Sequence, residues 1–528
     1  MLAGAPPAEA FNFARHVLEI NAGRPDGVAY IDDAEELTYG ELGRRIRQCG
    51  DALRNLGITR DERVLILLHD CIAWPVTFLG ALYAGIVPVP INTLSTVNDL
   101  TYVLRHSAAG AAVVGAPLLA TFREARQLAG AEEPFRSIVV GKADRSSLMM
   151  GEMSFDELLR SGRDTYSGVR SHRDAIAFWL YSSGSTGSPK GVVHTHANLY
   201  WTSELYAKPV LGIQEADRVF SAAKLFFAYG LGNALTFPLS VGASTVLMAE
   251  RPTPEAVFKR LTGAKPSIFC GSPALFAGML ASPALPLREA VRLRASTSAG
   301  EALPRELGER FSRHFGSHIL DGLGSTEMLH IFISNRPDDI RYGSTGKPID
   351  GYTVELRDEL GEPVAEGEIG DLWVSGPSSA LMYWNDRPRS LKTFHGPWLR
   401  TGDKYVLQDG YYTYAGRNDD MLKISGQYVS PFEVESTLLA HAAVLECAVI
   451  GVSDASGICK CKAFVVLNRA VAVRDLLAEE LQAFIKHRLA PFKRPHFVEF
   501  VDELPKTATG KIQRFKLRAQ HEAASPRS

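Results

Sequence analysis

Short apolar runs alternate with amphipathic segments along most of the chain. Runs rich in Val, Ile, Leu, Ala and aromatic side chains occupy residues 63–68, 87–91, 111–114, 137–140 and 175–180. Continuous apolar runs of this length predict strands that are buried on both faces. Between them the apolar positions follow helical spacing, as in residues 38–56, where Leu42, Ile46 and Leu53 share one face. This alternation predicts an α/β fold of mostly parallel sheets covered by helices.

A change of pattern near residue 418 predicts a domain boundary, because a polar Arg-Asn-Asp-Asp sequence there separates two β-rich runs. Shortly after it, Ser430-Pro431-Phe432-Glu433 predicts a helix start with an N-cap serine, a proline at the first position and a capping-box glutamate. Further strands are predicted at 444–452, 463–467 and 497–501, and a helix at 476–489. We therefore expect a large N-terminal α/β domain, residues 1–418, and a small mobile C-terminal α+β domain, residues 419–528.

The composition is that of an ordinary globular protein. The chain has 528 residues, of which 46% are hydrophobic and 22% charged, and its net charge is −2. This balance argues against a nucleic-acid partner and against a polybasic membrane anchor. The uncharged segment 71–98 is long enough for a membrane span, but its prolines and glycines divide it into a helix and a strand, so we expect no membrane association. Scattered cysteines without a zinc-site pattern, and the lack of a secretory signal, predict a cytoplasmic protein.

A hydroxyl-rich loop follows the apolar run at 175–180 and predicts a polyphosphate site. Its sequence at 181–191 is Tyr-Ser-Ser-Gly-Ser-Thr-Gly-Ser-Pro-Lys-Gly. Glycines allow backbone N–H groups to approach phosphate, hydroxyls donate further hydrogen bonds, and a lysine supplies charge. The candidate residues are Ser182, Ser183, Gly184, Ser185, Thr186, Gly187 and Lys190. The lysine stands at the wrong place for a Walker loop, and the alternative interpretation is a surface turn of small residues.

A second loop carries a carboxylate after a strand-like run. Residues 319–327 read Ile-Leu-Asp-Gly-Leu-Gly-Ser-Thr-Glu. This pattern suits a site where Thr326 binds a phosphate and Glu327 holds Mg²⁺, a cation that prefers oxygen ligands. The alternative is a solvated loop glutamate.

These stretches resemble the acyl-adenylate-forming superfamily, which includes acyl- and aryl-CoA synthetases, peptide-synthetase adenylation domains and beetle luciferases. The resemblance extends over nearly the whole chain and is strongest to the aryl-CoA ligase branch. It includes residues 296–304, 398–403, 414–426 and 504–514. Beyond the loop at 181–191, it implies ATP or AMP contacts from Gly300, Glu301, Ala302, Asp321, Gly322, Leu323, Thr326, Asp403 and Arg417. Because the family usually has an aromatic residue where Leu323 stands, adenine would meet an apolar contact there.

The resemblance also implies a carboxylate-substrate pocket. Its residues are Phe226, Phe227, Ala228, Tyr229, Gly324, His330 and Ile331. By chemistry alone the aromatic cluster at 226–229 is an apolar wall with one hydroxyl, and plain core packing explains it equally well. The single histidine is open to the same two interpretations.

The C-terminal part supplies the remaining implied residues. Asp419 would be the hinge between the domains, and Lys423 and Gly426 would lie on the CoA side. Lys511, in a Thr-Ala-Thr-Gly-Lys tip, matches the adenylation lysine, although on its own the stretch would be a solvated basic turn. The implied catalytic residues are Lys511, Thr186, Lys190 and Glu327.

The resemblance implies an enzyme that ligates a small aromatic carboxylate, benzoate above all, to coenzyme A, with ATP and Mg²⁺. A ligase for hydroxybenzoate or aminobenzoate, a stand-alone adenylation domain that loads a carrier protein, and a non-catalytic protein built on the same fold are the alternatives. Only a short tail follows the last motif, so we expect a stand-alone ligase. The resemblance is also compatible with a homodimer and with a lysine acetyltransferase and deacetylase acting on Lys511.

Overall fold

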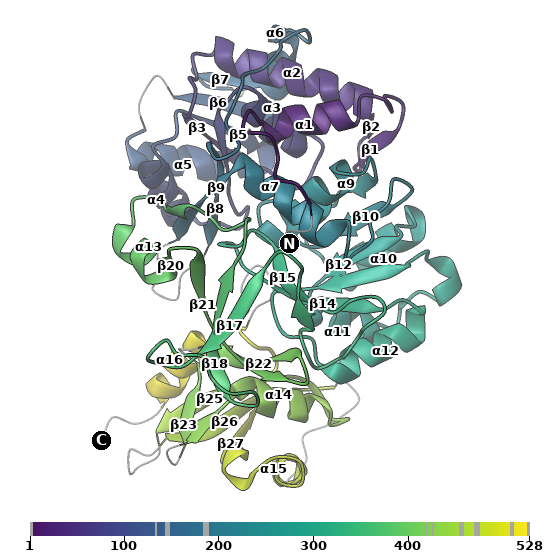
Figure 1. Ribbon diagram of the computed structural model, residues 1–528, viewed down its shortest axis with the longest axis vertical. Helices are drawn as coiled ribbons and strands as arrows, with labels where there is room; N and C mark the ends of the chain where they lie inside the picture. The colour runs from purple at the N-terminus through teal and green to yellow at the C-terminus, as the bar shows by residue number, and fades with distance from the viewer. Residues whose placement is uncertain are drawn as a thin grey trace.

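The structure is a computed structural model, shown in Figure 1. It describes residues 4–131, 135–142, 148–182, 189–417, 420–424, 427–453, 459–468, 476–506 and 512–524. In Figure 1 the elements β23–β27 and α14–α16 form the lower part of the molecule, and the strands β17, β18 and β21 lie between it and the larger part. The predicted α/β fold with a separate C-terminal unit is confirmed.

An all-parallel sheet lies in the upper part, as the continuous apolar runs predict. Its strand order is β4 (Val87–Pro90), β3 (Arg63–Leu67), β5 (Ala111–Gly115), β6 (Arg136–Val140) and β7 (Glu152–Ser154). One face packs on α1 (Phe13–Ile20), α2 (Tyr39–Asn55), α3 (Ala73–Tyr83) and α6 (Phe155–Ser161), and the other on α4 (Val97–Ser107) and α5 (Leu119–Ala129). Alternate side chains of β3 therefore enter two different cores, with Val64 and Ile66 in one and Leu65 and Leu67 in the other.

A nine-stranded sheet forms the centre of the molecule. Its order is β16 (Lys347–Pro348), β15 (Ile331–Ser334), β14 (Ile319–Gly324), β13 (Ala295–Ser298), β12 (Ile268–Gly271), β10 (Arg218–Ser221), β11 (Ser244–Val246), β1 (Val28–Ile31) and β2 (Glu36–Thr38). The strands from β14 to β1 are parallel, whereas the outer strands at both edges pair antiparallel. One face is covered by α10 (Pro254–Gly263), α11 (Pro273–Ala281) and α12 (Arg305–Phe315). Towards the other face lie α7 (His196–Thr202), α8 (Ala228–Leu231) and α9 (Phe237–Leu239).

Two antiparallel sheets join these layers, and the apolar pattern did not predict the larger of them. The smaller one has the order β19 (Met382–Tyr383), β9 (Lys190–Thr195) and β8 (Ile176–Ser182). The larger one contains β17 (Thr353–Arg357), β18 (Ile369–Ser375), β21 (Trp398–Gln408), β20 (Phe394–His395) and β22 (Tyr411–Arg417), and α13 (Arg387–Thr393) precedes β20. The run at 175–180 is β8 in the structure, and its central residues are buried as predicted.

The C-terminal unit has its own sheet and its own apolar core. It contains β23 (Leu422–Ile424), β24 (Gln427–Val429), α14 (Pro431–Leu439), β25 (Val444–Ser453), β26 (Cys459–Leu467), α15 (Leu477–Lys486), β27 (Phe497–Phe500) and α16 (Arg514–Ala524). Ser430 caps α14 as predicted, because its side chain accepts from the Glu433 N–H. The Glu433 carboxylate binds Lys493 Nζ at 2.7 Å, so the predicted reciprocal bond of a capping box is replaced by an ion pair. Among the described residues, no helix combines the length and the apolar character needed to cross a bilayer, and residues 71–98 form α3, β4 and the start of α4 instead.

Candidate active site

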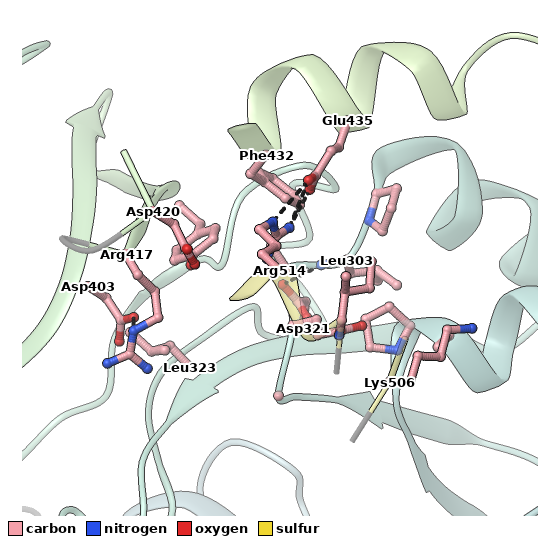
Figure 2. Close-up of a pocket in the computed structure, with 18 of the residues that line it drawn as sticks. Leu303, Asp321, Leu323, Asp403, Arg417, Asp420, Phe432, Glu435, Lys506 and Arg514 are labelled. Atoms are coloured by element: carbon pink, nitrogen blue, oxygen red, sulfur yellow. Dashed lines mark hydrogen bonds and ion pairs between the residues drawn. The ribbon is translucent and has the colours of Figure 1, made fainter. Parts of the chain in front are cut away.

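The candidate site lies where parallel strands of the central sheet end. Loops after β10, β13 and β14 leave the same edge of the sheet because the three strands are parallel. A cleft at this edge is lined by these loops and by the C-terminal unit (Figure 2). It brings together, from the sequence-predicted residues, Ser182, Lys190, Phe226, Phe227, Gly300, Glu301, Ala302, Asp321, Gly322, Leu323, Gly324, Thr326, Glu327, Asp403 and Arg417. Segments that lie far apart in the sequence thus meet in one cleft.

Several predicted residues cannot be placed. Ser183, Gly184, Ser185, Thr186, Gly187, Asp419, Gly426 and Lys511 lie outside the described residues. Lys423 belongs to β23, but its side chain is outside the described part. The roles of these residues remain predictions.

Lys190 and Glu327 meet in the lining of the cleft. Lys190 Nζ donates to Glu327 Oε1 at 2.8 Å and to Tyr383 Oη at 2.8 Å, and Tyr383 Oη donates to the same Glu327 oxygen at 2.7 Å. Burial alone would raise the pKa of Glu327, but the Lys190 charge and both hydrogen bonds outweigh it and hold that pKa below its ordinary value. Glu327 is therefore a carboxylate at neutral pH. Tyr383 was not predicted from the sequence, since it lies outside the stretches on which that prediction rested.

Glu327 is the residue that could hold a divalent cation. The described residues contain no group of three or more His, Cys, Asp or Glu side chains arranged for a metal ion. A single carboxylate beside a polyphosphate suits Mg²⁺, which binds through one or two carboxylates, phosphate oxygens and water. The donor set therefore fits a metal that arrives with a nucleotide.

Asp403 and Arg417 form one wall of the cleft. They stand opposite each other on the paired strands β21 and β22, and Arg417 Nε lies 3.6 Å from Asp403 Oδ1. The Asp403 charge raises the pKa of Arg417. Figure 2 shows this pair beside Leu323, whose side chain comes from β14. A carboxylate, a guanidinium and an apolar surface therefore face the same space.

Asp321 lies deeper in the same cleft. It is 3% exposed, and its Oδ2 accepts from the Leu303 N–H at 3.4 Å, whereas Oδ1 has no hydrogen-bond partner among the described residues. Burial raises the pKa of Asp321 to about 8. The segment opposite, after β13, turns at Gly300, whose φ of +97° favours glycine.

The predicted carboxylate-pocket residues divide into two groups. Phe226 and Phe227 line the cleft with their ring centroids 4.5 Å apart, and Gly324 also lines it. Ala228 and Tyr229 begin α8, and Tyr229 Oη lies 2.6 Å from Thr297 Oγ1 on β13. Ile331 begins β15 and pairs with Gly324.

His330 is held among aromatic rings. Its Nε2 donates to the Tyr229 carbonyl at 3.3 Å, and its ring centroid lies 4.5 Å from that of Phe237. Burial lowers the pKa of His330 to about 3, so the imidazole is neutral at pH 7. A Cβ on Gly232 would stand 2.2 Å from His330 Cδ2, so this glycine allows the close approach. The packing interpretation of His330, left open by the sequence, is the one that these contacts favour.

The turn from β14 to β15 connects the cleft residues of β14 with His330 and Ile331. Leu329 N–H donates to Thr326 O at 3.1 Å and His330 N–H to Met328 O at 2.8 Å. Leu329 has a φ of +64°, which is unfavourable for a branched side chain. A Cβ on Gly324 would stand 2.6 Å from His330 O. The turn is tight, and the residues on either side of it have little freedom.

The C-terminal unit reaches the cleft through residues that follow Lys511 in the sequence. The Ile512 N–H donates to Glu301 Oε1 at 3.3 Å, and Ile512 forms a β-bridge with Lys506. Arg514 Nη2 lies 2.7 Å from Glu435 Oε2 on α14, where Figure 2 shows the two side chains facing each other. A loop of the large domain and the C-terminal unit therefore share a direct hydrogen bond.

The chain matches known families and enzymes over nearly its whole length. The family model described as AMP-binding enzyme matches residues 17–384, and the model described as AMP-binding enzyme C-terminal domain matches residues 433–511. A benzoate–CoA ligase of Thauera aromatica is 54% identical over 97% of this chain and 98% of its own length. A 4-hydroxybenzoate–CoA/benzoate–CoA ligase of Rhodopseudomonas palustris is 42% identical over 97% of this chain and 94% of its own length. The crystal structure of a benzoate CoA ligase from Burkholderia xenovorans LB400 matches with a TM-score of 0.90 and 56% identity, over 96% of this chain and 100% of that one.

Proposed function

The chain belongs to the AMP-binding enzyme family, and from this premise we propose that it ligates benzoate to coenzyme A at the expense of ATP. The products are benzoyl-CoA, AMP and pyrophosphate, and benzoyl-adenylate is the intermediate. Identities of 54% and 56% to benzoate–CoA ligases over nearly the full chain support this substrate. The observation that carries the reaction is the cleft in which Lys190, Glu327, Asp403 and Arg417 converge from four separate segments.

The first half-reaction activates the carboxylate. Free benzoate is a poor electrophile, because a thiol would have to expel oxide. A carboxylate oxygen attacks the α-phosphorus of ATP, the bond to the bridging oxygen breaks, and pyrophosphate leaves with that electron pair. Such a transfer depends on positioning and charge stabilisation, which Lys190, Thr186 and Lys511 supply in this proposal.

The nucleotide is oriented by the side chains around it. Asp403 accepts hydrogen bonds from the ribose hydroxyls, Arg417 reaches the phosphate side, and Leu323 gives adenine an apolar contact. Mg²⁺, when bound, neutralises phosphate charge. In the MgATP complex, Glu327 would hold the metal and Thr326 would bind a phosphate. Asp321 and residues 300–302 border the base.

The acyl pocket in this proposal is apolar. Phe226 and Phe227 form its wall, and the neutral His330 closes it from behind without offering a charge. A flat, uncharged ring fits such a wall better than a polar or a long flexible chain.

The second half-reaction uses the same site after a rearrangement. The CoA thiol attacks the acyl carbon, and the mixed anhydride breaks to release AMP. We place the hinge at Asp419, at the proposed boundary between residues 1–418 and 419–528, and the CoA side at Lys423 and Gly426. Acetylation of Lys511 by a lysine acetyltransferase would remove the charge needed for adenylation, and a deacetylase would restore it.

Benzoate-dependent exchange of labelled pyrophosphate into ATP tests the first half-reaction, and a thioester assay with CoA tests the second. We expect both with benzoate, and neither in a Lys190→Ala variant that is folded by circular dichroism. Exchange without any CoA thioester would favour a carrier-loading adenylation domain. Absence of exchange with every aromatic carboxylate tested would overturn the proposal.

A further inference from the structure

Tyr383 closes a ring of hydrogen bonds around Lys190 and Glu327. The three distances are 2.8 Å for Lys190–Glu327, 2.8 Å for Lys190–Tyr383 and 2.7 Å for Tyr383–Glu327. Lys190 Nζ also stands 4.4 Å from the centroid of the Tyr383 ring, within the range of a cation–π contact. Tyr383 is only 2% exposed. The phenol is thus buried, whereas the Lys190 and Glu327 side chains linked to it are 18% and 13% exposed to the cleft.

The direction of each hydrogen bond follows from the chemistry of the groups. An ammonium can only donate, so Lys190 donates to both oxygens. The phenol oxygen accepts from Lys190, and its single O–H points to Glu327, which as a carboxylate only accepts. Burial and the nearby Glu327 charge raise the pKa of Tyr383 far above its ordinary value, so the phenol keeps its proton at neutral pH.

The backbone around Tyr383 ties the two motif segments together. Trp384 N–H donates to Gly191 O at 2.8 Å, and Leu381 N–H donates to Val193 O at 2.9 Å, which fixes residues 381–384 against β9. Ala380 N–H donates to the Glu327 carbonyl at 2.7 Å, which fixes the same segment against the loop after β14. The hydroxyl of Tyr383 is therefore held at a set position relative to both Lys190 and Glu327.

A nucleotide with its metal must change this ring. In the proposed function Lys190 turns to phosphate oxygens, and Glu327 gives an oxygen to Mg²⁺, so the direct Lys190–Glu327 bond is lost. The backbone of the segment that carries Tyr383 is fixed by the hydrogen bonds just described. The Tyr383 hydroxyl can therefore stay bonded to Glu327 Oε1 when the Lys190 side chain moves to the phosphates. The buried carboxylate then keeps one hydrogen bond, and its other oxygen is available to the metal.

We propose that Tyr383 is a positioning residue for nucleotide binding: its hydroxyl orients Glu327 toward the metal, and its ring and oxygen hold Lys190 until a polyphosphate takes the lysine over. This inference rests on the proposed function only in taking the ligand to be a metal–nucleotide complex. It adds a role for a residue to which no motif points.

The test is Tyr383→Phe, which keeps the ring and removes the hydroxyl. Tyr39→Phe is the matched control, because Tyr39 is also buried and its hydroxyl donates to the Ala243 carbonyl at 2.7 Å, far from the cleft on α2. Calorimetry should measure the binding of ATP with Mg²⁺ and of ATP with EDTA. Loss of a hydrogen bond to a charged group weakens binding by about 10–150-fold.

We expect Tyr383→Phe to weaken MgATP binding by about 10-fold or more and to change metal-free ATP binding by less than about 3-fold. Tyr39→Phe should change neither. Equal losses with and without the metal, or a loss no greater than that of the control, would overturn the proposal. Binding is measured without any carboxylate, so a failure of the benzoate reaction leaves this result readable.

Discussion

Arg514 offers a direct test of how the C-terminal unit is held together. Its guanidinium contacts Glu435 through Nε at 3.2 Å and through Nη2 at 2.8 and 2.7 Å, and the side chains are 21% and 6% exposed. Glu435 Oε1 also accepts from the Val449 N–H at 2.7 Å, so the carboxylate links α14, α16 and β25. Arg514→Met keeps the length of the side chain and removes the charge.

The expected cost follows from the carboxylate that is left behind. Removing one partner of a buried ion pair costs about 3–5 kcal/mol, because the remaining charge stays desolvated. We expect the lower end, about 3 kcal/mol, since water can reach part of the Arg514 side chain. This corresponds to roughly a 100-fold increase in the population of the opened C-terminal unit.

Hydrogen–deuterium exchange of β25 measures this population, because the Val449 amide is bound by Glu435 itself. Adding Glu435→Gln to Arg514→Met should restore most of the protection, since the amide oxygen still accepts from Val449 and no charge is buried. Arg305→Met is the surface control. Its partner Glu309 lies one turn further along α12, the two side chains are 76% and 38% exposed, and such pairs contribute about 0.3–0.5 kcal/mol. Exchange in Arg514→Met that rises no more than in Arg305→Met would refute the reasoning.

Three further predictions concern the reaction itself. With the apolar wall of Phe226 and Phe227, benzoate should have a higher kcat/KM than acetate, decanoate or 4-hydroxybenzoate. The difference from 4-hydroxybenzoate should be about 5–150-fold, because an unpartnered hydroxyl costs about 1–3 kcal/mol. The opposite order of kcat/KM would contradict an apolar pocket. Lys511→Ala should lose about 10²–10³-fold in benzoate-dependent adenylation, yet convert supplied benzoyl-adenylate and CoA to benzoyl-CoA, and equal failure in both assays would remove its assigned role. Asp419→Pro fixes φ near −65° and should slow thioester formation more than pyrophosphate exchange, whereas equal slowing of both steps would argue against a hinge.

The sequence predicted those elements whose pattern is set by local physics. The parallel strands β3 to β6 are continuous apolar runs because both of their faces are covered, and Ser430 caps α14 because its side chain needs only the local N–H of Glu433. The antiparallel sheet of β17, β18, β20, β21 and β22 was not predicted. Its strands carry Arg, Glu and Asp between apolar positions, and many of their residues are only half-buried, so no continuous apolar run marks them.

The candidate site was predictable where a motif is contiguous and not where a residue acts from a distance. Lys190 and Glu327 lie in recognisable loops, and the structure joins them across 137 positions of sequence. Tyr383 reaches them only because β19 pairs with β9, a long-range contact that leaves no periodic trace around residue 383. The Glu433 side chain was predicted to bond locally, but Lys493, distant in sequence, offered a charged partner.

The tight turn between β14 and β15 has a consequence for changing the substrate range of this fold. Residues 321–324 on one side of the turn and 330–331 on the other belong to a single stiff hairpin, with Leu329 at a positive φ and no space for a side chain at Gly324. A replacement at 330 or 331 should therefore also shift residues 321–324, which border the base in the proposed function. The loop at 226–228 follows another strand, β10, and lies outside this hairpin. Variant libraries at residues 226–228 should yield new acyl specificities while the nucleotide affinity is preserved. Variant libraries at residues 330 and 331 should lose the acyl specificity and the nucleotide affinity together.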